Sequence, residues 1–302
     1  MNAFRAVYRE GRRILRHGPS YPFLKYGGPA RILDARPTHT EIAGDVTVCC
    51  LTSKHDWRLC LWALVSFYEF AHCHHPLVIY EDGTLPKSAH GQILRLFPNA
   101  SIIDRRCADA VVPHALSTYP NCLRFRQAQP CARRIVDLPL LCGSRRILML
   151  DSDVLFLKTP EELVENLQSQ EPGQFVFERD LQDAYFASRE TIRERFDVEV
   201  AARVNCGIML ADISGFRYEL LEQWLGTADV YGHPWAEQTF WAMYAGKERT
   251  VLLGDEYNVT ATSRIDPNSV VKHYIKPIRE FMYVEGIPYL SAQFSAAGVF
   301  GK

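Results

Sequence analysis

The stretch that decides the fold is Ile147-Leu148-Met149-Leu150-Asp151-Ser152-Asp153-Val154-Leu155-Phe156, in which four apolar residues lead into two aspartates. The apolar run predicts a buried strand that ends at Leu150, directly before the two aspartates. In open α/β sheets, ligands bind beyond this carboxyl end of the strands. Residues two apart share a face of an extended chain, so Asp151 and Asp153 are placed to bind one cation, with Mg²⁺ or Mn²⁺ preferred. The structural alternative is a turn in which both aspartates cap the next segment.

Strand and helix patterns alternate around this stretch. Predicted strands are 46–51, 76–80, 100–103 and 146–150, and predicted helices are 58–71, 87–97 and part of 131–142. This order predicts an α/β fold with a mostly parallel sheet and helices on both faces. We expect residues 1–44 to form a basic helix and an irregular arm rich in Pro and Gly, and residues 45–302 to form one domain.

The composition is that of an ordinary globular protein. The 302 residues include 34 Lys and Arg against 35 Asp and Glu, which gives a formal charge of −1, and 47% are hydrophobic. These values exclude a disordered or collagen-like chain and argue against nucleic acid as the main partner. Nine cysteines without a C-x-x-C pair indicate reduced thiols. With no apolar run long enough to span a bilayer and no signal-peptide pattern, the expected location is cytoplasmic.

The N-terminus is strongly basic. Residues 3–16 predict a short amphipathic helix, with five arginines, one glutamate and apolar residues at helical spacing. One interpretation is peripheral contact with anionic lipid headgroups at the inner face of the membrane. The other is a solvated helix packed on the domain.

Two enzyme classes share an apolar run followed by Asp-x-Asp. In glycosyltransferases of the GT-A type the pair holds a metal on a nucleotide-sugar diphosphate, whereas in haloacid-dehalogenase-like phosphatases the first Asp is a nucleophile. The phosphatase motif normally opens its catalytic core, but here α/β pattern from Val46 onward precedes the motif, which favours the transferase. The phosphatase alternative uses Asp151 as nucleophile and Asp255-Glu256 as a later acidic pair. A non-catalytic sugar-nucleotide binder is a third hypothesis.

Residues 46–283 resemble the family 8 retaining glycosyltransferases, the group that includes glycogenin and bacterial lipopolysaccharide galactosyltransferases. Four motifs carry the resemblance in the family's order: 146–156, Val204-Asn-Cys-Gly-Ile-Met-Leu210, Glu237-Gln238 in place of Asp-Gln, and Lys272-His273-Tyr274. The resemblance implies a GT-A fold and the transfer of a hexose from a nucleotide diphosphate sugar, most often a UDP-sugar, to a glycan, lipid-linked or protein acceptor. The implied cofactor is Mn²⁺ or Mg²⁺.

The resemblance also implies roles for individual residues. His273 would complete the metal site with Asp151 and Asp153. Gln238 would lie beside the anomeric carbon, and Glu237 would bind sugar hydroxyls. The phosphate-binding residues are implied to be Arg279, which stands where the family has Lys, and Lys276, which stands where it has Gly.

The remaining implied contacts are with the donor nucleotide sugar. An amide at Asn205 can bind sugar hydroxyls, and Gly207 lets a substrate approach the backbone. Arg133 is as good a candidate as Arg134 for a sugar-contacting arginine. A zinc site at residues 72–75 is less favoured than a solvated helix end. The full set of predicted donor-binding residues is Thr52, Asp56, Arg134, Ser152, Asn205, Gly207 and Lys276.

Overall fold

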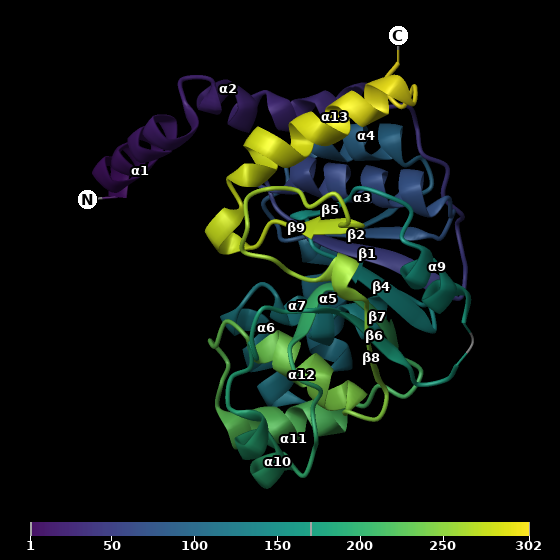
Figure 1. Cartoon of the computed structure of the whole chain (residues 1–302). Coiled ribbons are helices and arrows are strands. Elements are labelled where there is room, and N and C mark those ends of the chain that lie inside the picture. The colour runs from purple at the N-terminus through teal and green to yellow at the C-terminus, as the bar shows by residue number, and fades with distance from the viewer. Residues whose placement is uncertain (1, 170, 302) are drawn as a thin grey trace.

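The computed structural model describes residues 2–169 and 171–301 (Figure 1). A large sheet has the strand order β3-β2-β1-β4-β7-β6-β8, and a small sheet pairs β5 with β9. The strands are β1 Val46–Thr52, β2 Leu77–Glu81, β3 Ser101–Ile103, β4 Arg146–Leu150, β5 Val154–Phe156, β6 Phe175–Arg179, β7 Val204–Asp212, β8 Thr250–Leu252 and β9 Val271–His273.

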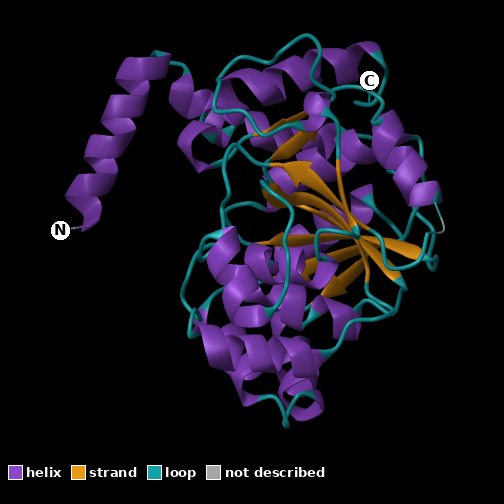
Figure 2. Ribbon diagram, turned by 60° about the horizontal axis from the view of Figure 1, so that its bottom comes forward, coloured by secondary structure: helices purple, strands orange, loops and turns teal. Residues whose placement is uncertain are grey.

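Helices cover both faces of the large sheet (Figure 2). Figure 1 shows α3, α4 and α13 above the strands, and α5, α6, α7, α11 and α12 below them. The helices are α1 Asn2–His17, α2 Tyr21–Tyr26, α3 Trp57–Ala71, α4 Lys87–Leu96, α5 Arg105–Ala115, α6 Pro120–Ala128, α7 Ala132–Val136, α8 Leu138–Leu141, α9 Glu161–Gln168, α10 Arg189–Phe196, α11 Tyr218–Ala228, α12 Ala236–Ala245 and α13 Ile287–Ala296. Short turns of helix are η1 Gly28–Asp34, η2 Asp255–Tyr257, η3 Lys276–Ile278 and η4 Met282–Gly286.

The central strands are apolar throughout because both of their faces are buried. In β4, Leu148 and Leu150 join the core cluster on the α3 side, whereas Ile147 and Met149 join the cluster on the α12 side. Successive side chains of a strand point to opposite faces, so a strand covered on both sides has no polar alternation. The sequence prediction of a buried strand over 146–150, directly before Asp151, is therefore confirmed.

The sheet is mostly parallel, as predicted. β1 pairs in parallel with β2 and β4, β2 with β3, and β6 with β8. The exception is β7, which runs antiparallel to both β4 and β6. This reversal brings the start of β7 to the carboxyl end of β4, where the acidic pair lies.

The Pro- and Gly-rich stretch near the N-terminus is more ordered than the sequence analysis expected. It contains α2 and η1, and each of these has a proline in its first turn, where the missing N–H costs nothing. The side chains of Tyr21 and Ile32 are fully buried, and the indole N–H of Trp62 in α3 donates to the carbonyl of Pro29. The expectation of an irregular arm is wrong for these residues because their apolar side chains pack against α3 and α13.

The predicted basic helix is present as α1. Figure 1 shows it extending away from the sheet and its covering helices. Among the described residues, no helix has the length and apolar character that a transmembrane span requires.

Candidate functional site

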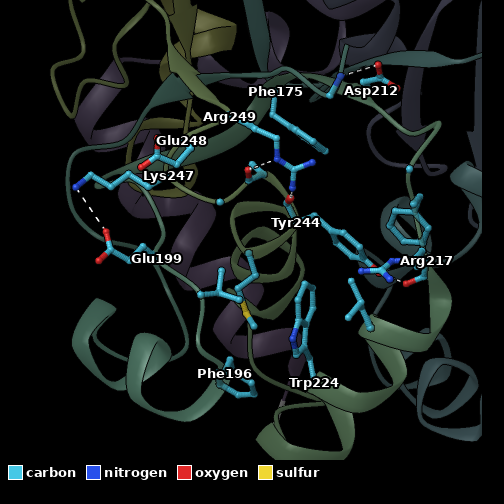
Figure 3. Close-up of a pocket in the computed structure, with 18 of the residues that line it drawn as sticks. Phe175, Phe196, Glu199, Asp212, Arg217, Trp224, Tyr244, Lys247, Glu248 and Arg249 are labelled. Carbon is cyan, nitrogen blue, oxygen red and sulfur yellow. Dashed lines mark hydrogen bonds and ion pairs between the residues drawn. The ribbon is translucent and has the colours of Figure 1, made fainter.

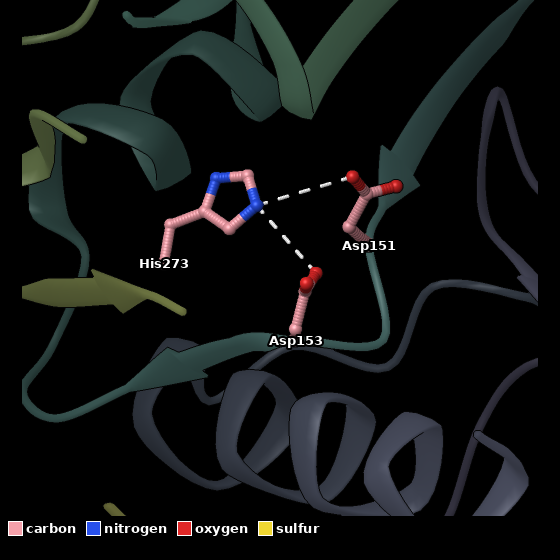
Figure 4. Close-up of side chains that lie close together, drawn as sticks. All are labelled: Asp151, Asp153 and His273. Atoms are coloured by element: carbon pink, nitrogen blue, oxygen red, sulfur yellow. Dashed lines mark ion pairs between the residues drawn. The ribbon is translucent and has the colours of Figure 1, made fainter. Parts of the chain in front are cut away.

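Asp151, Asp153 and His273 lie together beyond the carboxyl end of β4 (Figure 4). One donor atom from each lies within 4.8 Å of the other two. Nε2 of His273 is 4.0 Å from Oδ2 of Asp151 and 3.5 Å from Oδ1 of Asp153. Donors that share one octahedral cation lie roughly 3–4 Å apart. Two carboxylates and an imidazole in this arrangement fit a divalent cation.

The small sheet brings His273 to the acidic pair. Val154 of β5 lies opposite His273 of β9, and the N–H of Tyr274 donates to the carbonyl of Asp153 at 2.8 Å. On the other side, the N–H of Asp151 donates to the carbonyl of Gly207 in β7 at 2.8 Å. Backbone pairing with two different strands therefore fixes the Asp-Ser-Asp turn in place.

Glu178 holds the far side of the His273 ring, and the sequence analysis missed it. Its Oε2 lies 2.9 Å from Nδ1 of His273, and its side chain is fully buried. A carboxylate can only accept, so Nδ1 carries the proton and Nε2 faces the two aspartates. Without a cation, burial opposes the charged imidazole, but Glu178 and Asp153 outweigh it and raise the pKa of His273 well above its usual range. The missed signal was an acidic residue directly after the apolar run Phe175-Val176-Phe177.

Gly207 makes room for the same ring. A Cβ at this position would lie 2.3 Å from Cε1 and 2.6 Å from Nδ1 of His273, which is closer than packing allows. The position of the His273 ring therefore explains why residue 207 is a glycine. The predicted contact between Gly207 and a donor stays a prediction.

Replacing Glu178 with glutamine is expected to weaken Mn²⁺ binding by roughly 10- to 100-fold, because a neutral amide accepts from Nδ1 more weakly than a carboxylate and no longer makes the imidazole a stronger ligand. Calorimetric titration of the purified protein with Mn²⁺ measures this change. The matched control is Glu165→Gln on the exposed face of α9, which should leave the Mn²⁺ affinity unaltered. Equal affinities in all three proteins would show that Glu178 does not orient His273.

Arg134 links the acidic pair to Glu237. Its Nη1 lies 3.0 Å from Oδ1 of Asp151, and its Nε lies 3.6 Å from Oε1 of Glu237. It also donates from Nη2 to the carbonyl of Cys206. Arg133 was an equal candidate by sequence, but it is the guanidinium of Arg134 that reaches the site. Arg133 is also buried, and its Nε has no partner among the described residues.

Glu237 is a buried carboxyl with an incomplete set of partners. Its Oε1 accepts no hydrogen bond from the described residues. Burial raises its pKa to about 7; Arg134 opposes this shift, and the negative charge of Asp151 adds to it. This carboxyl can therefore exchange a proton near neutral pH.

Asn205 is paired with Asp180, a second residue that the sequence analysis missed. The Asn205 amide donates from Nδ2 to Oδ2 of Asp180 at 2.7 Å, and its Oδ1 accepts from the N–H of Gly207 at 2.7 Å. Both side chains line the same cavity as the acidic pair. Asp180 lies two residues after Glu178; Glu178 is near the end of β6 and Asp180 directly follows that strand, whereas Asp151 and Asp153 both follow β4.

Gln238 is held by two backbone groups at the start of α12. Its Oε1 accepts from the N–H of Cys206 at 3.1 Å, and its Nε2 donates to the carbonyl of Ala184 at 3.0 Å. These bonds assign the orientation of the amide and connect α12 to β7. Gln238 also lines the cavity.

Arg279 connects three of the predicted residues. Its Nη1 lies 3.5 Å from Oδ2 of Asp153, and its Nη2 lies 3.2 Å from Oδ1 of Asp56 and 3.3 Å from the Ser152 hydroxyl. Burial disfavours the charged guanidinium, but Asp153 and Asp56 outweigh this and raise the pKa of Arg279. Lys276 is exposed at the rim of the same cavity.

Thr52 is the predicted site residue that the structure leaves outside this cluster. It ends β1 and is buried, and its hydroxyl has no partner among the described residues. It does not line the cavity that contains the acidic pair.

Most of the predicted site residues line one cavity of about 600 Å³. Its size is within the range of small-molecule sites, and its lining mixes apolar surface with convergent charges. Trp235, which is 40% exposed, lies on its wall. The predicted residues that line it are Arg134, Asp151, Asp153, Asn205, Gly207, Glu237, Gln238, His273, Lys276 and Arg279.

A second cavity, of about 710 Å³, lies at the opposite end of β6 and β7, beside Phe175 and Asp212 (Figure 3). Figure 3 shows Trp224 and Tyr244 within a set of charged side chains that includes Arg249. The one group of three potential metal ligands in the described part of the chain is not here. Size alone therefore does not identify the site.

The His-Cys-His-His stretch does not form a metal site in the described structure. It follows α3, which ends at Ala71, and His72 has left-handed backbone with φ 49°. The ring of His74 instead contacts the carbonyl of His39 through Nδ1 at 3.1 Å. This agrees with a helix end rather than a zinc cluster.

The sequence matches no protein-family model and no curated protein. Solved structures do resemble it. The galactosyltransferase LgtC, solved with donor and acceptor sugar analogs, is 15% identical with a TM-score of 0.54, over 82% of this chain and 95% of that chain. Mouse xyloside xylosyltransferase 1 is 18% identical with a TM-score of 0.50, over 78% of this chain and 99% of that chain. The glycosyltransferase GlyE of Streptococcus pneumoniae TIGR4 is 15% identical with a TM-score of 0.53, over 86% of this chain and 64% of that chain.

Identities this low establish the fold rather than the activity. The similarity extends over most of this chain in each case. The chain therefore has the GT-A glycosyltransferase fold, and it resembles the family 8 enzymes as its four sequence motifs predict.

Proposed function

We propose that this protein is a Mn²⁺- or Mg²⁺-dependent retaining glycosyltransferase that moves a hexose from a nucleotide diphosphate sugar to an acceptor hydroxyl. The observation that carries the proposal is the convergence of Asp151, Asp153, His273 and Arg279 in one cavity of a GT-A fold. These groups come from segments far apart in the sequence, and their residue types suit a metal diphosphate. The donor is proposed to be a UDP-sugar on the family resemblance.

When bound, the cation would neutralise charge on the departing diphosphate. The side chains of Asp151, Asp153 and His273 would hold it. Arg279 supplies a fixed positive charge beside this site, and its contacts with Ser152 and Asp56 keep its guanidinium oriented before substrate arrives. Lys276, which is exposed on the same cavity, is a second cation for the phosphates.

The sugar would lie near Gln238 and the Asn205–Asp180 pair. The fixed amide of Gln238 offers a neutral dipole to an oxocarbenium-like species. Asn205 and Asp180 offer hydrogen-bond groups for sugar hydroxyls, as does Glu237, which lines the same cavity and contacts Arg134. Arg134 forms ion pairs with both Asp151 and Glu237, so it positions these two carboxylates. It would also contact the donor.

The acceptor is proposed to be a glycan, a lipid-linked glycan or a protein side chain. Trp235 on the cavity wall offers an apolar face of the kind on which sugar rings stack. A reducing compartment, the cytoplasm, is proposed because all nine cysteines are free thiols, which suits a reducing environment.

Two arguments favour transfer over phosphatase chemistry. The GT-A fold is that of nucleotide-sugar enzymes rather than of haloacid-dehalogenase-like proteins. The acidic pair Asp255-Glu256, which a phosphatase would need beside Asp151, lies instead in η2, where Glu256 lines a separate cavity with Glu162.

A thermal-shift screen with UDP, GDP, ADP and CDP, each with and without Mn²⁺, tests the proposal. We expect one nucleoside diphosphate to raise the melting temperature only when Mn²⁺ is present, because ligands that bind the folded state stabilise it. The matching nucleotide sugar should then be hydrolysed slowly to that diphosphate. Stabilisation without any hydrolysis or transfer would indicate a binder, and release of phosphate from a monoester would indicate a phosphatase.

A further inference from the structure

Helix α1 carries an apolar face that nothing in the described structure covers. Val7 is 73% exposed, Tyr8 is 67% exposed and Leu15 is 88% exposed, although these types normally contribute to cores. Positions 7, 8 and 15 share one face of a helix. Both views show α1 standing off from the body of the molecule, beyond α2 (Figures 1 and 2).

The opposite side of α1 is cationic in an otherwise acidic chain. Residues 1–26 contain six Lys and Arg but one Glu, a formal charge of +5, whereas the whole chain has −1. Arg12, Arg13 and Arg16 line a hollow of about 500 Å³ together with Leu15 and Glu280. Arg13 and Arg16 contact Glu280 in this hollow, so the exposed guanidinium of Arg12 is the one best placed for a lipid phosphate, and the neighbouring leucine suits an acyl chain.

A contact near the catalytic cavity anchors this helix. Nε of Arg13 lies 3.0 Å from Oε2 of Glu280, and Nη1 of Arg16 lies 2.7 Å from Oε1 of the same carboxylate. Glu280 directly follows Arg279, whose guanidinium contacts Asp153. The cationic helix is therefore attached beside the residue that we assign to the donor phosphates.

We propose that α1 is a membrane-docking helix that binds anionic phospholipid bilayers, with its apolar face among the acyl chains and its arginines on the lipid phosphates. Charge favours an anionic bilayer as the occupant: residues 1–26 carry a formal charge of +5, so a second α1 packed on the same apolar face would bring like charges together, whereas anionic headgroups neutralise them. Docking through α1 holds the catalytic cavity near lipid-linked acceptors. The docking itself is independent of the proposed transferase activity, although its use for lipid-linked acceptors rests on that activity.

Co-sedimentation of the full chain with vesicles tests this proposal. Vesicles of phosphatidylcholine with about one third phosphatidylglycerol should bind the protein at least tenfold more strongly than pure phosphatidylcholine vesicles, and added salt should weaken the binding. Leu15→Glu should lower the binding roughly tenfold, because the variant loses the leucine that would be buried among the acyl chains of the bilayer. Arg12→Gln should lower it about fivefold, since each cation near an anionic surface contributes a factor of this size.

The matched control is Val111→Glu on α5, an exposed apolar position elsewhere, which should bind vesicles as the native chain does. Failure of the native chain to bind anionic vesicles would overturn the proposal, as would equal binding by Leu15→Glu. A dimer that Leu15→Glu dissociates, without vesicle binding, would assign the face to self-association instead. Donor hydrolysis should be unchanged in Leu15→Glu, so vesicle binding without any hydrolysis would contradict the proposed enzyme and leave the docking helix intact.

Discussion

Asparagine in place of Asp153 is expected to lower turnover of the nucleotide sugar by roughly a thousandfold, because a neutral amide removes one of two carboxylates from the cation. The same variant should lose the Mn²⁺-dependent rise in melting temperature with the matching nucleoside diphosphate. Asp153 lies 3.5 Å from both His273 and Arg279, so its charge serves the metal and the phosphate clamp together. Steady-state release of nucleoside diphosphate and the thermal shift measure the two effects.

Asp255→Asn is the matched control for this prediction. Asp255 is exposed in η2, and the same chemical change there should leave both measurements as in the native chain. The control also separates the two enzyme classes, since the phosphatase hypothesis requires the Asp255-Glu256 pair. Loss of activity in Asp255→Asn with full activity in Asp153→Asn would contradict the metal site described above.

Between about pH 4.5 and 7, the free energy of unfolding of the metal-free protein should fall by on the order of 3 kcal/mol more than that of Glu237→Gln. The unfolded chain releases the Glu237 proton near the ordinary pKa of 4.5, whereas burial keeps it on the folded protein up to about pH 7. In this window the folded state binds more protons, so stability decreases as pH rises. Below the window the two proteins should have the same pH dependence.

Urea unfolding at a series of pH values, carried out on both proteins, measures this difference. Glutamine copies the neutral carboxyl in size, so it removes the titration and leaves the packing. Arg134 favours the charged form and Asp151 disfavours it, so both act on the same equilibrium. If the free energy of unfolding varied with pH in the same way for both proteins, Glu237 would have an ordinary pKa and be accessible to water.

The parts of the site that can be predicted from the sequence are those in which a single short segment shows both which residues are present and where in the fold they lie. The strand 147–150 has no polar residue, and its burial on both faces follows directly from that pattern. The acidic pair then has to lie at the strand's carboxyl end. The helix through residues 58–71 and the arginine-rich N-terminal helix are likewise evident from periodicity.

The roles of Glu178 and Asp180 could not be predicted from the sequence pattern. Glu178 lies near the end of β6, and Asp180 directly follows this strand. The neighbours of β6 are β7 and β8, which come later in the sequence, and the register of β6 against β7 shifts between Phe177 and Glu178. Without that pairing nothing in Phe-Glu-Arg-Asp distinguishes a histidine partner from a surface acid. Arg133 and Arg134 show the same limit, because one step along a helix rotates a side chain by about 100° and only the packing says which faces the site.

The sequence by itself determined the α/β class, through the order of its strand and helix patterns. It also determined the two aspartates after a buried strand, with donor types that suit a cation, and the charge of the N-terminal helix, since each of these depends on a short segment of chain. The family resemblance named His273 as a candidate ligand, but only the tertiary structure brings it beside the acidic pair. Tertiary structure alone decided that Glu178 orients this ring, that Gly207 leaves space for it and that Arg134 rather than Arg133 reaches Asp151. The physical reason is that these contacts depend on strand pairing and close packing between distant segments, which no local pattern encodes.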